Sequence, residues 1–202
     1  MARRRSAPAL DPLADPELAW RALDITRQAE AMGLLQDAAA ASSQDRFRVA
    51  MRSLAGHGIG ADALALVEGG TVAPATLDRV REALEDSPIP DLELRQLQRL
   101  FGWDDLAGML HASVGSLRRY AASQRETPDE VAARAHWLAG VVGDLRGAYN
   151  DAGVRRWFSR PRSALGDRRP VDILTPAWSP DDADVRKVRE LAGWLSGPGA
   201  AT

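Results

Sequence analysis

The sequence predicts an all-α fold. Every segment with regular hydrophobic spacing repeats with the period of an α-helix, and no segment of useful length alternates between apolar and polar residues. A polar residue followed by proline, a typical helix start, recurs at Asp15-Pro16, Thr127-Pro128 and Ser179-Pro180. At 202 residues the chain can form one ample domain or two small ones.

A helical N-terminal region is predicted over residues 15–87, after an arm at 1–14 that we expect to be disordered. Asp15 as the N-cap and Pro16 at the first helical position open its first helix, which we expect to stop at Gly33. The spacing predicts further helices over 44–55, 61–68 and 74–85, and residues 36–43 read as either weak helix or linker.

Pro88 and Pro90 mark the clearest boundary in the chain, because two prolines forbid a continuous helix. Helices are then predicted over 91–101 and 104–110, followed by a helix capped by Ser113 that runs to about Ser123. A capping box at Thr127–Glu130 predicts a long helix that continues to Tyr149, with an interruption at Gly153. The last helix is predicted to start at Ser179-Pro180 by nearly the same device, and Gly197-Pro198-Gly199 to end the ordered chain.

Charge is distributed unevenly along the chain. The net charge is −2, but residues 146–176 carry seven arginines against three aspartates, a local +4. This basic island predicts one surface that faces an anion or an acidic partner. Cysteine is absent and the three histidines are far apart, so we expect no disulfide, no zinc site and no cofactor.

Catalytic motifs are not found in the sequence. It contains no Gly-x-Ser-x-Gly, no His-Glu-x-x-His and no phosphate-binding loop lysine, so we expect no enzymatic activity. No window of about 18 apolar residues could span a membrane, and prolines interrupt any signal-peptide pattern after Arg3-Arg4-Arg5. We therefore expect a cytoplasmic protein.

Residues 103–120 fit a helix-turn-helix within a region that we delimit as 91–126. Ala107 is small enough for a close crossing of the two helices, and Leu117 can anchor the second helix in the core. The exposed N-terminal half of such a second helix reads base edges in the major groove. The predicted DNA-binding residues are Ser113, Gly115, Ser116, Arg118, Arg119 and Arg125. His111 replaces the usual glycine at the turn, so an ordinary helical hairpin is the alternative.

Residues 58–84 resemble the tail of a Cro-type repressor domain, in which an acidic residue and glycine precede Pro-x-x-Leu and a closing helix. Ala63, Leu64 and Ala65 stand where polar base-reading residues would be expected. We therefore expect this unit to be degenerate and to serve packing or dimerisation.

Residues Trp157 to Leu174 combine large apolar groups with six charged residues in 18 positions. That mixture predicts a locally folded surface that binds another protein. Aromatic residues there could act as binding hot spots, and Arg160, Arg162, Arg168 and Arg169 could pair with acidic groups of the partner. The alternative is that Trp157, Leu165, Ile173 and Leu174 form the small core of the C-terminal half, while the arginines and loop residues bind.

From about Leu94 to Leu195 the chain resembles the Xre/MbcA/ParS antitoxin family. The resemblance implies a helix-turn-helix that binds operator DNA, a toxin-binding module over 127–197, and a RES-domain toxin that degrades NAD as partner. It implies that the antitoxin covers the active-site cleft of the toxin and represses its own operon. The positions that match the toxin-binding pattern are Trp157, Phe158, Pro161, Leu165, Gly166, Pro170, Ile173 and Leu174. A homodimer is expected, because palindromic operators pair with two-fold proteins. A stand-alone helix-turn-helix regulator without a toxin is the alternative.

Overall fold

The computed structural model describes residues 14–35, 42–174 and 177–195, and over these residues the chain is all-helical, as predicted. The described residues form eleven α-helices and one 3-10 helix, and they form no β-strand apart from a single bridge between Arg162 and Arg168. Residues 1–13 of the predicted arm, residues 36–41 and the predicted end at 197–199 lie outside the described residues.

Four helices form the N-terminal region. They are α1 (Pro16–Ala31), α2 (Ser43–Gly56), α3 (Ala61–Glu68) and α4 (Pro74–Glu85). Asp15 caps α1 by accepting a hydrogen bond from the amide of Glu17 at 2.8 Å, and Pro16 occupies the first turn as predicted. Gly33 follows with φ +79°, a conformation that glycine adopts without strain.

The central helices also begin and end within two residues of the predicted positions. They are α5 (Pro90–Phe101), α6 (Trp103–Leu110) and α7 (Val114–Ala121). Ser123 lies just beyond α7 with φ +54°, and the amide of Gln124 donates to the carbonyl of Arg119. This left-handed closing turn ends α7 two residues earlier than the sequence predicts.

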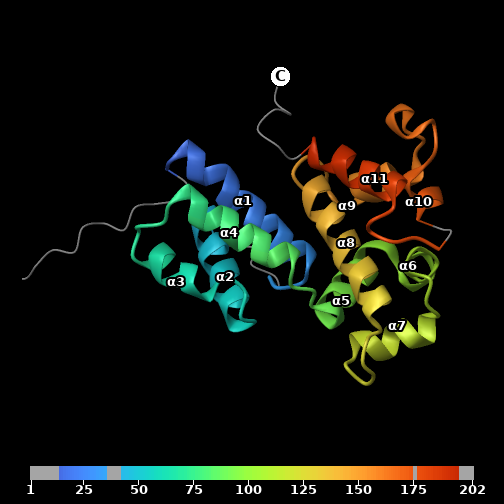
Figure 1. Cartoon of the computed structure of the whole chain (residues 1–202), viewed down its shortest axis with the longest axis horizontal. Coiled ribbons are helices and arrows are strands. Elements are labelled where there is room, and N and C mark those ends of the chain that lie inside the picture. Colours follow the sequence, from blue (N-terminus) through green and yellow to red (C-terminus); the bar gives the residue numbers. More distant parts are fainter. Residues whose placement is uncertain (1–13, 36–41, 175–176, 196–202) are drawn as a thin grey trace, which may run out of the picture.

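The long helix α8 (Asp129–Leu145) lies at the centre of the molecule and contacts α1, α5, α6 and α11 (Figure 1). The start of α8 differs from the prediction, because the predicted capping box at Thr127–Glu130 does not form. Pro128 is the N-cap, and no side chain caps the helix. The helix also ends at Leu145, because the amides of Gly147 and Ala148 donate to carbonyls three residues back, in place of the helical bond to the fourth residue back. Tyr149 is therefore an exposed residue beyond the helix and not part of its buried stripe.

Two helices of the described C-terminal part, α9 (Asp151–Ser159) and α10 (Pro170–Ile173), were not predicted from the sequence. Helix α9 starts because the side chain of Asn150 accepts a hydrogen bond from the amide of Gly153 at 2.9 Å. Gly153 thus lies in the first turn of a helix and does not interrupt one. The elements here are α9 (Asp151–Ser159), the 3-10 turn η1 (Ser163–Leu165), α10 (Pro170–Ile173) and α11 (Ala183–Gly193).

The start of α11 also differs from the prediction. The helix begins at Ala183, because Asp182 and not Ser179 is its N-cap. The carboxylate of Asp182 accepts from the amide of Ser179 at 2.8 Å, so the Ser179–Asp182 stretch is a turn that precedes the helix.

One continuous cluster of buried apolar side chains joins the N-terminal and C-terminal parts of the described chain. Helix α1 packs along α8 and against α4, and α11 packs on α8 (Figure 1). Gly140 and Gly143, unfavourable inside a helix, allow α11 and α1 to approach α8 closely. A Cβ atom at Gly140 would overlap the guanidinium of Arg189, and one at Gly143 would overlap the amide of Gln28. None of the described helices is long and apolar enough to cross a bilayer.

Candidate functional site

Helices α6 and α7 are joined by a tight turn centred on His111. His111 adopts φ +53° and ψ +43°, the left-handed conformation that the predicted helix-turn-helix requires at this position. Ser113 then caps α7 with its hydroxyl, which accepts from the amide of Ser116 at 3.1 Å. Leu117 is fully buried and anchors α7 in the core, and Ala107 is partly buried. The turn and the cap therefore form at the predicted residues.

The side chains predicted to read DNA lie mostly on the surface. Ser113, Gly115, Arg118, Arg119 and Arg125 are exposed, and Ser116 is half-buried. Arg119 forms no side-chain interaction within the described part of the chain. Arg118 lies over the Trp103 ring at 5.9 Å from its centroid, and Arg125 lies over Tyr120 at 5.8 Å. No carboxylate among the described residues neutralises these three guanidiniums, so they present positive charge to solvent.

Three side chains that sequence reasoning missed fix the helix pair in place. Arg95 donates to the carbonyl of Ala121 at the end of α7. Trp178 donates its indole N–H to the carbonyl of Met109 at 2.7 Å, and Arg134 donates to the carbonyl of Trp178 at 2.8 Å. The partners are 26, 69 and 44 residues apart in sequence, so no local pattern could have identified these bonds.

The Trp157–Leu174 segment buries its apolar residues. Trp157 is 1% exposed and Leu174 is fully buried, and Phe158 packs edge-on against Phe101 with ring centroids 5.2 Å apart. This placement supports the alternative of a small core and corrects the expectation that these side chains face a partner. The six predicted toxin-binding residues that are buried are Trp157, Phe158, Leu165, Pro170, Ile173 and Leu174.

Three arginines of this segment, Arg162, Arg168 and Arg169, form contacts within the chain. Arg162 donates to the carbonyl of Trp157 at 3.3 Å and lies 5.0 Å from the centroid of that ring. Its amide also donates to the carbonyl of Arg168 at 3.0 Å. These bonds hold the segment as a closed loop against α9.

Ion pairs at the loop surface engage the other two arginines. The side chain of Arg168 pairs with Asp184 of α11 at 2.5 Å, and Arg169 pairs with Asp172 through both carboxylate oxygens. The hydrogen bond from Arg169 lowers the pKa of Asp172, and that from Arg168 lowers the pKa of Asp184. Of the predicted toxin-binding residues, Arg160, Pro161 and Gly166 stay exposed with no side-chain partner among the described residues.

Metal ligands do not gather in the described part of the chain, where no group of three or more histidine, aspartate or glutamate side chains could hold an ion. No family model, curated protein or solved structure matches this chain. The resemblance to the antitoxin family therefore rests on the quoted residues and stays a prediction.

Proposed function

We propose that this chain is an antitoxin that binds operator DNA through α7 and a RES-domain toxin through the loop between α9 and α10. The observation that carries the proposal is the exposed pair Arg118 and Arg119 on a capped helix behind a left-handed turn. A helix-turn-helix presents its second helix to the major groove in this way, and a bidentate arginine contact to guanine contributes about 1–3 kcal/mol of discrimination.

The toxin-binding half of the proposal is supported by the unpaired charge on the loop. Arg160 is exposed beside Pro161, and Arg156 lies exposed one turn earlier on α9. Neither guanidinium pairs with an acid among the described residues, so both are available to a carboxylate of a partner. The buried Trp157 and Phe158 then act as the rigid base of this surface and not as its contacts.

The DNA half is tested with the double variant Arg118→Ala/Arg119→Ala. Fluorescence anisotropy with DNA from upstream of the chain's own reading frame should show an affinity loss of about tenfold or more. Binding of the parent protein should weaken steeply as salt rises, because phosphate contacts release counterions. Arg79→Ala is the matched control, since Arg79 is an exposed arginine of α4 with no side-chain partner among the described residues. Equal affinity of the double variant and the control for this DNA would refute the role of α7.

The toxin half is tested by co-expression with the neighbouring reading frame. A stable complex should co-purify through one tag, and Arg156→Glu/Arg160→Glu should release the partner while the helical content measured by circular dichroism stays unchanged. If no partner co-purifies and DNA binding persists, the chain is a stand-alone helix-turn-helix regulator. A homodimer is expected in either case, and analytical ultracentrifugation measures it directly.

A further inference from the structure

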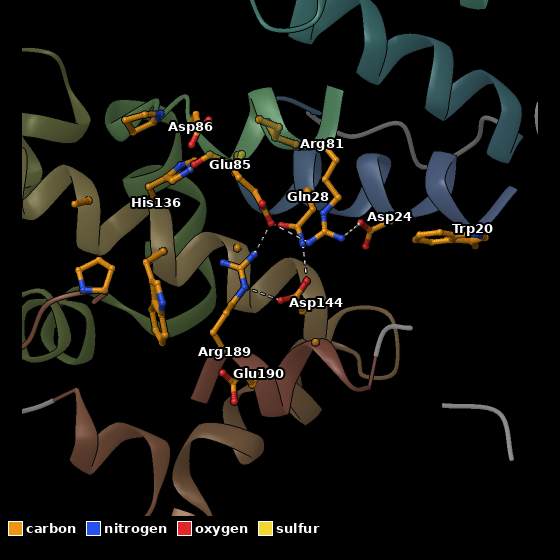
Figure 2. A pocket seen from close by; sticks show the side chains of 18 residues that line it. Trp20, Asp24, Gln28, Arg81, Glu85, Asp86, His136, Asp144, Arg189 and Glu190 are labelled. Carbon is orange, nitrogen blue, oxygen red and sulfur yellow. Dashed lines mark hydrogen bonds and ion pairs between the residues drawn. The ribbon is translucent and has the colours of Figure 1, made fainter. Parts of the chain in front are cut away.

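His136 of α8 lies beside the point where α4 ends and α5 begins. It lines a cavity of about 660 Å³ between α1, α4, α8 and α11, and Figure 2 shows it next to Glu85 and Asp86 at the end of α4. Neither Arg118 nor the loop around Arg160 lines this cavity. The role of His136 is therefore independent of the proposed DNA and toxin binding.

Both ring nitrogens of His136 face hydrogen-bond acceptors. Nδ1 lies 2.7 Å from the carboxylate of Glu93 on α5, and Nε2 lies 2.7 Å from the backbone carbonyl of Glu85 at the end of α4. A neutral imidazole carries a single N–H, whereas the imidazolium donates from both nitrogens. The two contacts thus need two protons, which an imidazolium beside an ionised Glu93 supplies.

The carbonyl of Glu85 has no amide partner from the residues that follow α4. A continuing α-helix would offer it the amide of Ile89, four residues on, but that amide donates to Glu93 at 3.2 Å. His136 supplies the missing donor, and its positive charge lies against the negative end of the α4 dipole. An imidazolium at this position therefore stabilises the end of α4 through a hydrogen bond and through its charge.

The linker of residues 86–89 separates α4 from α5, and two prolines limit its own hydrogen bonding. Pro88 and Pro90 have no amide hydrogen, so no backbone donor holds the chain at these positions. His136 bonds to the last residue of α4 on one side of the linker and to the first turn of α5 on the other. One side chain of α8 thus joins the two ends of the linker.

Glu93 makes the proton on His136 matter for the start of α5. Glu93 is fully buried, and His136 is the cation that pairs with it among the described residues. The second carboxylate oxygen of Glu93 is buried and has no hydrogen-bond partner in that part of the chain. Removing one charge of a buried pair leaves the other uncompensated, which is strongly destabilising. Loss of the proton from His136 therefore acts on both ends of the linker.

The charged groups around His136 are mostly acidic. Arg189 of α11 opposes the imidazolium, but it is itself paired with Asp144 at 2.8 Å. On α5, Asp91 and Arg95 pair with each other at 2.9 Å. The other charged groups that line the cavity, on α1, α4 and α11, are Asp24, Arg81, Glu85, Asp86 and Glu190. Since four of these five are carboxylates, the surrounding charge favours the protonated form.

These contacts raise the pKa of His136 above its ordinary value. Burial by itself lowers this pKa, but the hydrogen bond and the attraction to Glu93, together with the hydrogen bond to Glu85, outweigh burial. The proton on His136 therefore stabilises the folded chain in full below the unfolded pKa of about 6.5. This contribution is lost as the pH rises through the higher folded value.

We propose that His136 is a pH-sensitive clamp, which holds the linker of residues 86–89 against α8 while it is protonated and releases it when it is neutral. Neutral His136 keeps its one N–H on the carboxylate of Glu93, because a charge-assisted hydrogen bond is the stronger of the two. Its bare Nε2 then faces the carbonyl oxygen of Glu85, and two acceptors at that distance repel each other. The linker therefore separates from α8 at the end of α4.

Proton NMR of the full chain tests the protonation step, because the sequence has only three histidines, His57, His111 and His136. The ring signal of His136, assigned by its loss in His136→Gln, should titrate above about pH 6.5 in the parent protein. Glu93→Gln removes the buried charge, keeps the size of the side chain and should move this titration to lower pH. Titration of the parent at or below about pH 6.5, or an unchanged titration in Glu93→Gln, would overturn the proposal.

Hydrogen exchange measures the release of the linker. From about pH 6 to about pH 8.5, across the histidine range, protection of the Asp86 and Ile89 amides should fall. The loss should be about tenfold after correction for the intrinsic exchange rate, since a hydrogen bond from a charged group is broken. His136→Gln keeps a side-chain N–H for Glu85 and has no proton to lose in this range, so its protection should not change. The amide of Gln124, in the turn after α7, is the control and should stay constant in both proteins. Equal protection of the linker amides at both pH values in the parent would refute the clamp, whether or not the variant folds.

Discussion

The α6–α7 helix pair and the Trp157–Leu174 segment both carry arginines, and they use them in opposite ways. On α7, Arg118 and Arg119 project into solvent and no described carboxylate neutralises them. In the segment, Arg162, Arg168 and Arg169 bind a backbone carbonyl, Asp184 and Asp172 within the same chain. A run of arginines in a sequence therefore does not by itself predict an available positive surface, because intramolecular partners decide how much of the charge remains.

The largest expected effect separates the core of the segment from its surface. Trp157→Ala should lower the free energy of unfolding by about 3–5 kcal/mol, because it removes a buried aromatic ring and leaves a cavity. Arg160→Ala in the same segment should change it by no more than about 0.5 kcal/mol. Urea denaturation measures both. If the two variants were equally stable, Trp157 would have to be a surface residue after all.

The second expected effect concerns the arginine that closes the loop. Arg162→Ala removes the hydrogen bond to the carbonyl of Trp157 and the contact with its ring, and should cost about 1–2 kcal/mol. Arg119→Ala on α7 breaks no described side-chain contact and should leave stability within about 0.5 kcal/mol. Thermal denaturation of the two variants would contradict the comparison if Arg119→Ala were the more destabilised.

A smaller effect is expected at the turn between α6 and α7. His111→Gly should stabilise the protein by up to about 1 kcal/mol, because glycine adopts the left-handed conformation without the strain that a side chain introduces. Ala112→Gly next to it has no such strain to relieve and should destabilise by about 0.4–1 kcal/mol through the greater freedom of the unfolded chain. A loss of stability in His111→Gly, measured by urea denaturation, would show that the imidazole makes a contribution larger than the strain.

The smallest effect is a pH dependence confined to the loop. The pKa values of Asp172 and Asp184 are lowered in the folded chain, so their pairs with Arg169 and Arg168 stabilise it above the unfolded pKa of about 3.9. This contribution is lost as the pH falls through the lower folded values. Hydrogen exchange of the Arg162 amide should therefore lose protection in strong acid, and the double variant Asp172→Asn/Asp184→Asn should lose this step. Protection that is independent of pH in the parent chain would contradict the role of these pairs.

Most helices could be predicted from sequence, because their start and stop signals are local. The Asp15-Pro16 start, the Pro88–Pro90 boundary and the Ser113 cap each act within one helical turn. The prediction failed at α9 and at α10. At α9, Gly153 was interpreted as an interruption, although its amide donates to the side-chain oxygen of Asn150, which caps a helix there. The surface and core residues of the Trp157–Leu174 segment could not be separated in the same way, since its irregular turns follow no single period.

The candidate sites differ in how far sequence could identify them. The residues of α7 follow from a local pattern of turn, cap and buried anchor, so the exposure of all of them except the half-buried Ser116 was predicted correctly. The cavity was not predicted, because Asp24, Arg81, Asp144 and Arg189 meet only when α1, α4, α8 and α11 pack together. One sequence signal of this packing is a pair of glycines inside a helix, Gly140 and Gly143. A Cβ atom at these positions would overlap the side chains of Arg189 and Gln28.

The sequence by itself determined the helical class and most helix starts, since these depend on hydrogen bonds and side chains a few residues apart. The tertiary structure decided which aromatic residues are core, which arginines stay unpaired and where a cavity remains. These outcomes depend on contacts such as Trp178 with Met109 and Gln28 with Asp144, across 69 and 116 residues. Burial and ion pairing between distant residues are set by the packing of helices, and no local pattern encodes that packing.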